Sequence, residues 1–288
     1  MKHLSLKSFL PLLAATALFT GCASTSDPYT PQHSKGFVYD DDMSFAMNVI
    51  DGSLGFHNGL RDARRPKDAD TSPTSLDYAA DGIIGAAFGG GLGGAFLSML
   101  GTNQGNEPLH TYYGIVYYPI NEGANIQTVF DAIEKELIAT AEQKRDLKFI
   151  EKTFKDGNHS LSFKGQACIA QGQIMGYTPK ETCNFISYYN PKLLRYSDVT
   201  PNGDKGRFAV ISYPEFFTGG ALSLDLDEKY YVFTPVLRKR TKFPFVSNAQ
   251  KIYPFVKPSE SGENTSLSIE QLIDIDPWMS RFYNGGNK

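Results

Sequence analysis

The residue types that most often carry out catalysis occur in this chain without the spacing that catalysis needs. No two of its five histidines stand four residues apart, and no H-E-x-x-H zinc motif occurs. No serine lies in the G-x-S-x-G pattern of nucleophile-elbow hydrolases. The carboxylate pairs Asp225/Asp227 and Asp274/Asp276 are of the kind that glycosidases use, but acids two apart more often share a solvated face. We therefore expect no catalytic residues, no metal ligands, no cofactor and no enzymatic activity.

Nucleotide and nucleic-acid binding are also disfavoured. Gly89, Gly91 and Gly94 match the literal pattern G-x-G-x-x-G, which binds dinucleotides where a strand leads into a helix. Here any helix after Gly94 is interrupted at Gly101, and no Gly-Lys-Ser/Thr follows. The net charge of −3 provides no basic field for nucleic acid.

The three cysteines point to covalent chemistry of another kind. Cys22 follows a positively charged start and a short apolar run, Phe9–Phe19, as in a secretory signal peptide. Cys168 and Cys183 are then the two remaining thiols of an exported chain, and a disulfide is the simplest use for them. The pair has no further ligands nearby that would complete a metal site.

The segment Leu18-Phe19-Thr20-Gly21-Cys22 resembles the lipobox of bacterial lipoproteins, although Phe19 stands where Leu is usual. The resemblance implies cleavage after residue 21, acylation of Cys22, including a palmitate chain, and anchoring in membrane lipid. Ala23 follows the cysteine in place of the Asp that retains such proteins in the inner membrane. The implied location is the outer membrane, with the folded domain in the periplasm.

The glycine-rich stretch 82–101 is the most unusual feature of the sequence. As a helix it would be about 30 Å long, the thickness of a bilayer's hydrocarbon core. Small residues repeat every fourth position along one face, where they allow close helix packing in lipid. These interface residues are Gly85, Gly89, Gly93, Ala86, Gly90 and Gly94. The bulky residues Ile84, Phe88, Leu92 and Phe96 lie opposite.

This pattern is similar to the glycine-zipper helices of outer-membrane lipoproteins that form rings or act in surface exclusion. The resemblance implies self-association through the small-residue face. Two other interpretations stay open: a helix packed in the protein's own core, or a glycine-rich loop, since eight glycines weaken a helix in water.

The remaining sequence divides into regions of different character. We expect a signal peptide at 1–21, a flexible tether at 22–38, and a helical region at 39–108 containing the glycine-rich helix at 75–101. An α+β periplasmic domain follows at 109–258, and a tail with a short helix at 259–288. The triplet Asp40, Asp41 and Asp42 is expected to cap a helix that follows it, since its spacing does not suit a calcium loop.

The sequence of the region 109–258 predicts a mixed domain with a mainly antiparallel sheet and one long amphipathic helix. The helix begins after Asn125 and carries one apolar stripe, which consists of Ile126, Val129, Phe130, Ile133, Leu137, Ile138 and Ala141. Asp156-Gly157 predicts a hairpin turn, and Asn202-Gly203-Asp204 predicts another turn. The expected strands are 112–120, 147–154, 160–169, 184–189, 207–213, 230–237 and 243–246.

Four tyrosine doublets fall in these strands, at 112–113, 117–118, 188–189 and 230–231. Alternation sends the two members of each doublet to opposite faces of a sheet. Outward tyrosines would suit sugar, protein or membrane contact, whereas a sheet covered on both faces would bury them.

Two functional hypotheses follow from these observations. The first is an oligomeric, non-enzymatic outer-membrane lipoprotein in envelope assembly, transport or surface exclusion, with other envelope proteins as partners. The second is a monomeric periplasmic module that binds a ligand or a protein and packs the glycine-rich helix in its own core. An enzyme acting on envelope polymers has no motif in its favour.

Overall fold

The computed structural model describes residues 37–55, 60–62, 111–235, 243–258, 262 and 264–271. Its helices are α1 (Phe45–Leu54), α4 (Ile126–Arg145), α5 (Gln166–Met175) and the 3-10 helix η1 (Gly219–Leu224). Its strands are β1 (Tyr113–Pro119), β2 (Leu147–Lys155), β3 (Asn158–Gly165), β4 (Thr182–Tyr189), β5 (Lys192–Val199), β6 (Lys205–Pro214), β7 (Phe217–Thr218), β8 (Tyr230–Thr234), β9 (Phe245–Asn248) and β10 (Lys251–Pro254).

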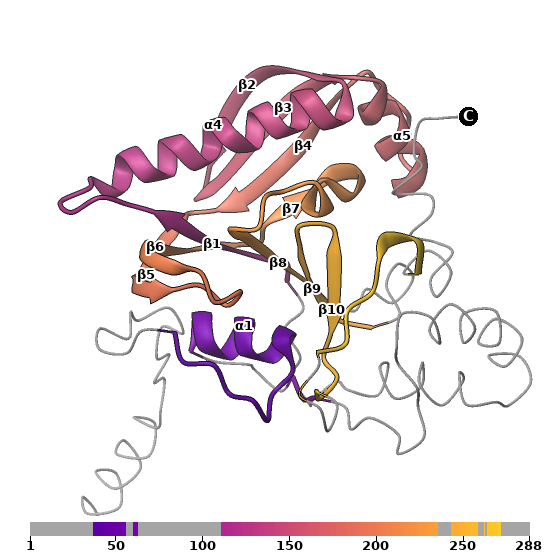
Figure 1. Ribbon diagram of the computed structural model, residues 1–288. Helices are drawn as coiled ribbons and strands as arrows, with labels where there is room; N and C mark the ends of the chain where they lie inside the picture. The colour runs from indigo at the N-terminus through magenta and orange to yellow at the C-terminus, as the bar shows by residue number, and fades with distance from the viewer. Residues whose placement is uncertain are drawn as a thin grey trace, which may run out of the picture.

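The strands form two antiparallel sheets, as Figure 1 shows. The larger sheet has six strands in the order β10-β9-β8-β1-β6-β5, and the smaller has four in the order β2-β3-β4-β7. The expected α+β class with a mainly antiparallel arrangement is therefore confirmed. Strands far apart in the sequence pair in the larger sheet, since β1 lies between β6 and β8.

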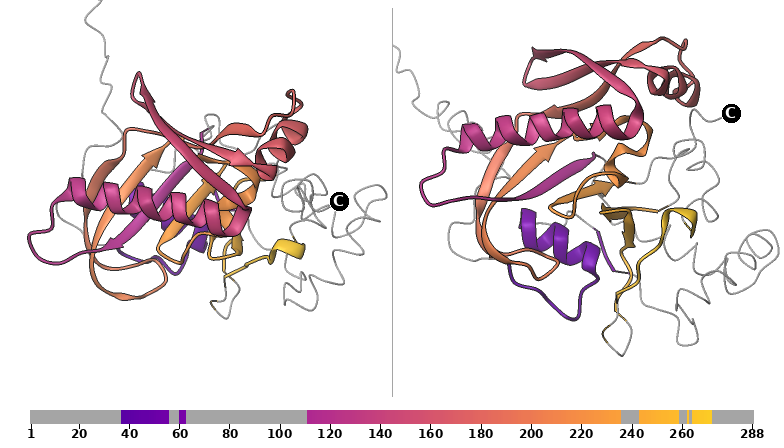
Figure 2. Two further views of the ribbon diagram at one scale, coloured as in Figure 1. Left: turned by 90° about the horizontal axis from the view of Figure 1, so that it is seen from above. Right: turned by 45° about the horizontal axis from the view of Figure 1, so that its top comes forward.

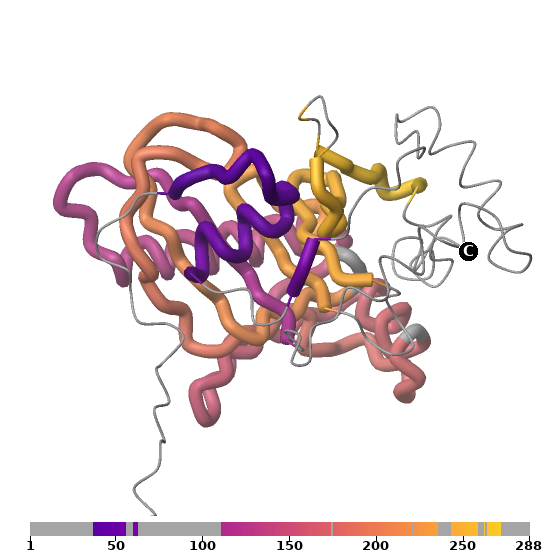
Figure 3. The backbone as a smooth tube through the Cα atoms, turned by 90° about the horizontal axis from the view of Figure 1, so that it is seen from below, coloured from indigo at the N-terminus to yellow at the C-terminus, as the bar shows by residue number. Residues whose placement is uncertain are grey.

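Both faces of the six-stranded sheet are covered, and strand alternation distributes the core between them. Ile115 and Tyr117 of β1 face α1, whereas Val116 between them faces α4 and the second sheet. Figure 3 shows α1 lying across the sheet from below, and Figure 2 shows α4 running along the junction with the strands β2, β3 and β4. The arrangement is three layers with two apolar cores.

The start of α1 corrects one expectation. The helix is capped by Ser44, whose hydroxyl accepts a hydrogen bond from the Met47 N–H at 3.0 Å. The acidic triplet 40–42 lies before this cap, and the first turn of α1 contains no acidic residue. A serine hydroxyl reaches the free N–H groups of the first turn directly, so the nearer Ser44 takes the capping position.

The chain before α1 is held against the body by aromatic packing. The Phe37 side chain is buried, and its ring meets that of Tyr117 edge to face with centroids 6.3 Å apart. Gly52 allows this approach, because a Cβ there would come within 2.6 Å of the Phe37 ring. The described chain is therefore fixed to the sheet from residue 37 onward.

The long helix α4 forms as the sequence predicts. The side chain of Asn125 caps it by accepting from the Gln127 N–H at 2.8 Å. Four stripe residues are buried, namely Val129, Ile133, Leu137 and Ala141, and the other three pack at the edge of the same core. Twenty residues of helix thus bury one face between the two sheets.

The β2–β3 hairpin is also confirmed. Asp156 and Gly157 both have positive φ, 52° and 83°, which is the backbone of a type I′ turn. The predicted strand 160–169, however, is wrong at its end, because α5 begins at Gln166. Strands β5, β7 and β10 were not predicted.

Several expectations lie outside the described residues. These are the signal peptide, Cys22, most of the tether and the whole glycine-rich helix, 75–101. Of the expected tail helix at 267–275, residues 267–271 are described: Leu267 forms a β-bridge with Ile252, and residues 269–271 are helical. Within the part of the chain that the structure covers, no helix is both long and apolar enough to cross a membrane.

Candidate functional site

Two glutamates on α4 lie beside the buried stripe, one toward each sheet. Glu134 faces strands β2 and β4, and Glu136 faces β1 and β8. Each carboxylate is met by a lysine ammonium group and by tyrosine hydroxyl groups. A helix with charges on both flanks of its apolar stripe can hold polar groups at the junction of two sheets.

The environment of Glu134 combines charge and hydrogen bonding. The Lys152 ammonium nitrogen lies 2.6 Å from its Oε2 atom, and the Tyr188 hydroxyl donates to the same oxygen. Burial, followed by the bond to Glu134, raises the pKa of Tyr188 well above its usual range. The phenol therefore stays protonated at physiological pH and acts as a donor.

Glu136 has a similar environment on the other flank. Its Oε2 atom accepts from the Tyr230 hydroxyl at 2.7 Å and lies 2.7 Å from the Lys229 ammonium nitrogen. Tyr118 donates to its other oxygen at 3.3 Å. Burial first, and then Glu136, raise the pKa of Tyr230. Both carboxylate oxygens of Glu136 therefore have partners within the protein.

A cavity of about 310 Å³ opens beside Glu134. α4 contributes Gln127, Asp131 and Glu134 to its lining, while the ring of Phe130 provides an apolar patch. The strands contribute Lys152, His159, Tyr188 and Tyr213. This volume is at the low end of the range for small-molecule sites, and its mixed lining is typical of them.

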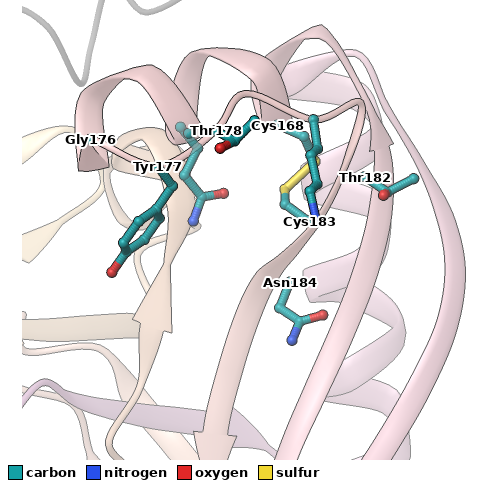
Figure 4. Close-up of a pocket in the computed structure, with 10 residues that line it drawn as sticks. Cys168, Gly176, Tyr177, Thr178, Thr182, Cys183 and Asn184 are labelled. Carbon is teal, nitrogen blue, oxygen red and sulfur yellow. A yellow bond between two sulfur atoms is a disulfide. The ribbon is translucent and has the colours of Figure 1, made fainter.

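A second, more open cavity of about 650 Å³ lies where α5 meets β4. Figure 4 shows the disulfide at its wall, with Tyr177, Thr178 and Asn184 around it. The bridge joins Cys168 and Cys183, whose Cα atoms are 5.4 Å apart, so the predicted disulfide is confirmed. It ties α5 to β4 and thereby fixes this wall of the cavity.

The other residues considered for chemistry have structural partners. Asp225 forms an ion pair with Arg145 of α4 at 2.5 Å, and Asp227 lies 4.0 Å from the Lys229 ammonium nitrogen. Asp225 and Asp227 thus contact different basic residues, Arg145 and Lys229. Asp274 and Asp276, and the glycine-rich interface residues from Gly85 to Gly94, lie outside the described residues. No group of three potential metal ligands occurs among the residues the structure describes.

Each tyrosine doublet has at least one buried member, and both members of the doublet 230–231 are buried. Tyr117 and Tyr231 face α1, whereas Tyr118 and Tyr230 lie on the opposite face and bond to Glu136. Tyr188 is buried next to Glu134, and its neighbour Tyr189 is exposed. A sheet covered on both faces therefore explains these doublets better than a row of outward tyrosines.

The Glu134 cavity was not predicted from the sequence. Its residues come from α4, from the consecutive strands β2, β3 and β4, and from β6 of the other sheet, so no local motif joins them. No protein-family model, no curated protein and no solved structure matches the chain. The chemistry of the cavity must therefore be inferred from its own residues.

Proposed function

We propose that this chain is an outer-membrane-anchored lipoprotein whose folded body has a non-enzymatic, accessory role in the envelope. The disulfide between Cys168 and Cys183 carries this proposal, because such bridges persist in exported proteins and are rare in reducing compartments. The bridge uses both cysteines of the folded part. Cys22, in its lipobox-like context, is then left as the acylation site.

Within this role, the folded body is a binding module. The small cavity beside Glu134 supports this second part of the proposal, since a preformed hollow that combines aromatic surface with convergent polar groups is typical of ligand sites. The glycine-rich stretch supports self-association in the membrane as a separate property of the same protein.

Replacing Cys22 tests the anchor. We expect mass spectrometry of the mature protein to find a lipid-modified N-terminus at Cys22, and the protein to fractionate with outer membranes. Cys22→Ser should abolish the modification and alter processing. Cys183→Ala is the matched control, because it removes a cysteine but leaves the lipobox intact; it should still be acylated. An unmodified mature N-terminus at another residue would refute the proposal.

A further inference from the structure

Two buried polar groups of the Glu134 cavity have no hydrogen-bond partner. The hydroxyl of Tyr213, a residue only 2% exposed, is unpaired among the described residues, and so is the Nδ1 atom of His159. Both residues line the cavity. An unsatisfied buried polar group destabilises a folded protein, yet this structure places two such groups beside the same cavity.

The rings that carry these groups are firmly positioned. The ring of His159 stacks on that of Tyr188, with centroids 5.0 Å apart and planes inclined by 12°. Tyr213 meets the other side of this cluster edge to face, with its centroid 5.1 Å from that of Tyr188. Tyr188 is in turn bonded to Glu134. The unpaired atoms therefore belong to a preorganised aromatic cluster, which is how binding sites reduce the entropic cost of association.

The two groups differ in the kind of hydrogen bond they offer. Burial, followed by the charges of Glu134, Glu136 and Asp131, raises the pKa of Tyr213, so its phenol keeps its proton and donates. The Nε2 atom of His159 lies 3.2 Å from the amide oxygen of Asn190. A histidine ring whose Nε2 atom donates to that oxygen has its Nδ1 atom free to accept when Nδ1 carries no proton. A ligand must therefore accept at one point and donate at another.

The charges of the cavity give an ion little to bind. Two carboxylates, Asp131 and Glu134, line it together with one lysine, so an anion meets net negative charge. Glu134 is already paired with Lys152 at 2.6 Å, so a cation would be attracted only by Asp131, which is exposed and whose charge is screened by solvent. A neutral molecule needs neither charge and leaves the pair between Glu134 and Lys152 intact.

We propose that this cavity binds a small, neutral, hydroxyl-rich molecule of monosaccharide size. Hydroxyl groups both donate and accept, which matches the Tyr213 hydroxyl and the His159 Nδ1 atom together. The ring of Phe130 adds an apolar contact of the kind that carbohydrate C–H groups make with aromatic rings. The inference deepens the proposed binding role and does not depend on the acyl anchor.

The probes are three neutral hexoses, glucose, galactose and mannose, tested by calorimetry and by ligand-induced NMR shifts on the mature, detergent-extracted chain. Glucosamine and glucuronate serve as cationic and anionic analogues of the same size. We expect saturable binding of at least one neutral hexose, and at least tenfold weaker binding of both charged analogues.

Tyr213→Phe removes the unpaired hydroxyl and keeps the ring contact with Tyr188. This variant should bind the hexose at least tenfold more weakly, as expected for one lost hydrogen bond, while its melting temperature stays equal or rises. Tyr118→Phe is the matched control: its hydroxyl bonds to Glu136 outside the cavity, and the variant should bind normally.

Two outcomes overturn the inference in different ways. Saturable binding of a charged analogue in place of the neutral hexoses would contradict the ligand class and leave the binding role standing. Failure of all five probes to bind, or equal hexose binding by Tyr213→Phe, would contradict the site itself. Neither result bears on the acylation of Cys22, which is measured separately.

Discussion

Both carboxylate oxygens of Asp62 bond to Ser44: one accepts from its backbone N–H at 2.7 Å and the other from its hydroxyl at 2.5 Å. Ser44 is the cap of α1, so a residue eighteen positions later holds the capping side chain in place. The start of α1, which covers one face of the six-stranded sheet, is thus tied to a partly buried acid.

This contact predicts a pH effect on stability. Burial raises the pKa of Asp62 above its usual value of 3.8, while its bonds to Ser44 and the charge of Lys257 oppose the shift. The folded state therefore holds the proton more tightly than the unfolded state. The resulting stabilisation is fully present below about pH 4 and is lost as the pH rises through the raised pKa.

Asp62→Asn removes this titration but keeps one oxygen that can accept from Ser44. Urea unfolding between about pH 4 and 7 should show that the parent loses stability relative to the variant as the pH rises. Asp41→Asn, at an exposed position before the same helix, is the control and should follow the parent profile. Parallel profiles for Asp62→Asn and the parent would contradict the prediction.

The second prediction concerns the contribution of the disulfide to stability. It closes a loop with a sequence separation of 15, which the chain-entropy model associates with about 3 kcal/mol of stabilisation. Cys168→Ala should lower the free energy of unfolding by about 2–4 kcal/mol. The measurement is denaturant unfolding with and without reductant.

The double variant Cys168→Ala/Cys183→Ala supplies the control for reductant, because its stability should not change when reductant is added. Thiol labelling of the native protein without reductant should find neither Cys168 nor Cys183 free. Two reactive thiols in the native protein would show that the bridge does not form in solution.

The third prediction concerns self-association. A large side chain at Gly89 would push apart helices that pack through the small-residue face, so Gly89→Leu should dissociate the oligomer. Phe88→Leu exchanges one apolar residue for another on the opposite face and should leave it assembled. Crosslinking in membranes, together with circular dichroism of the purified variants, measures assembly and folding separately. A wild-type protein that is monomeric both in membranes and in mild detergent rules out the ring.

Local signals predicted the elements that depend on local chemistry. α4 has a capping asparagine and an unbroken apolar stripe, and the β2–β3 hairpin has the Asp156-Gly157 pair that a type I′ turn requires. In both cases the residues that determine the structure lie within a few positions of one another. Their backbone geometry follows from short-range sterics and hydrogen bonds.

The missed elements depend on longer contacts. α5 has only a weak amphipathic pattern, so its apolar start, Ala167–Ile169, resembles a continuation of β3 in the sequence. The disulfide that attaches α5 to β4 is a contact between residues fifteen positions apart. β5 contains two irregularities in its pairing with β6, after Leu193 and after Ser197, which break the alternation that marks a strand. The Glu134 cavity also depends on long-range contacts, since the packing of α4 between the two sheets brings its residues together.

The burial of Phe37 sets a limit on where the folded body can be. Phe37 lies fifteen residues after Cys22 and is already packed against Tyr117. A fully extended chain of that length reaches about 50 Å, and a flexible one spans about 20 Å on average. If Cys22 carries the lipid, the folded body stays within this distance of the membrane surface. It then meets its ligands and partners within that zone. The effective concentration of the folded body there depends on the length of the segment between Cys22 and Phe37, and not on the volume of the whole compartment.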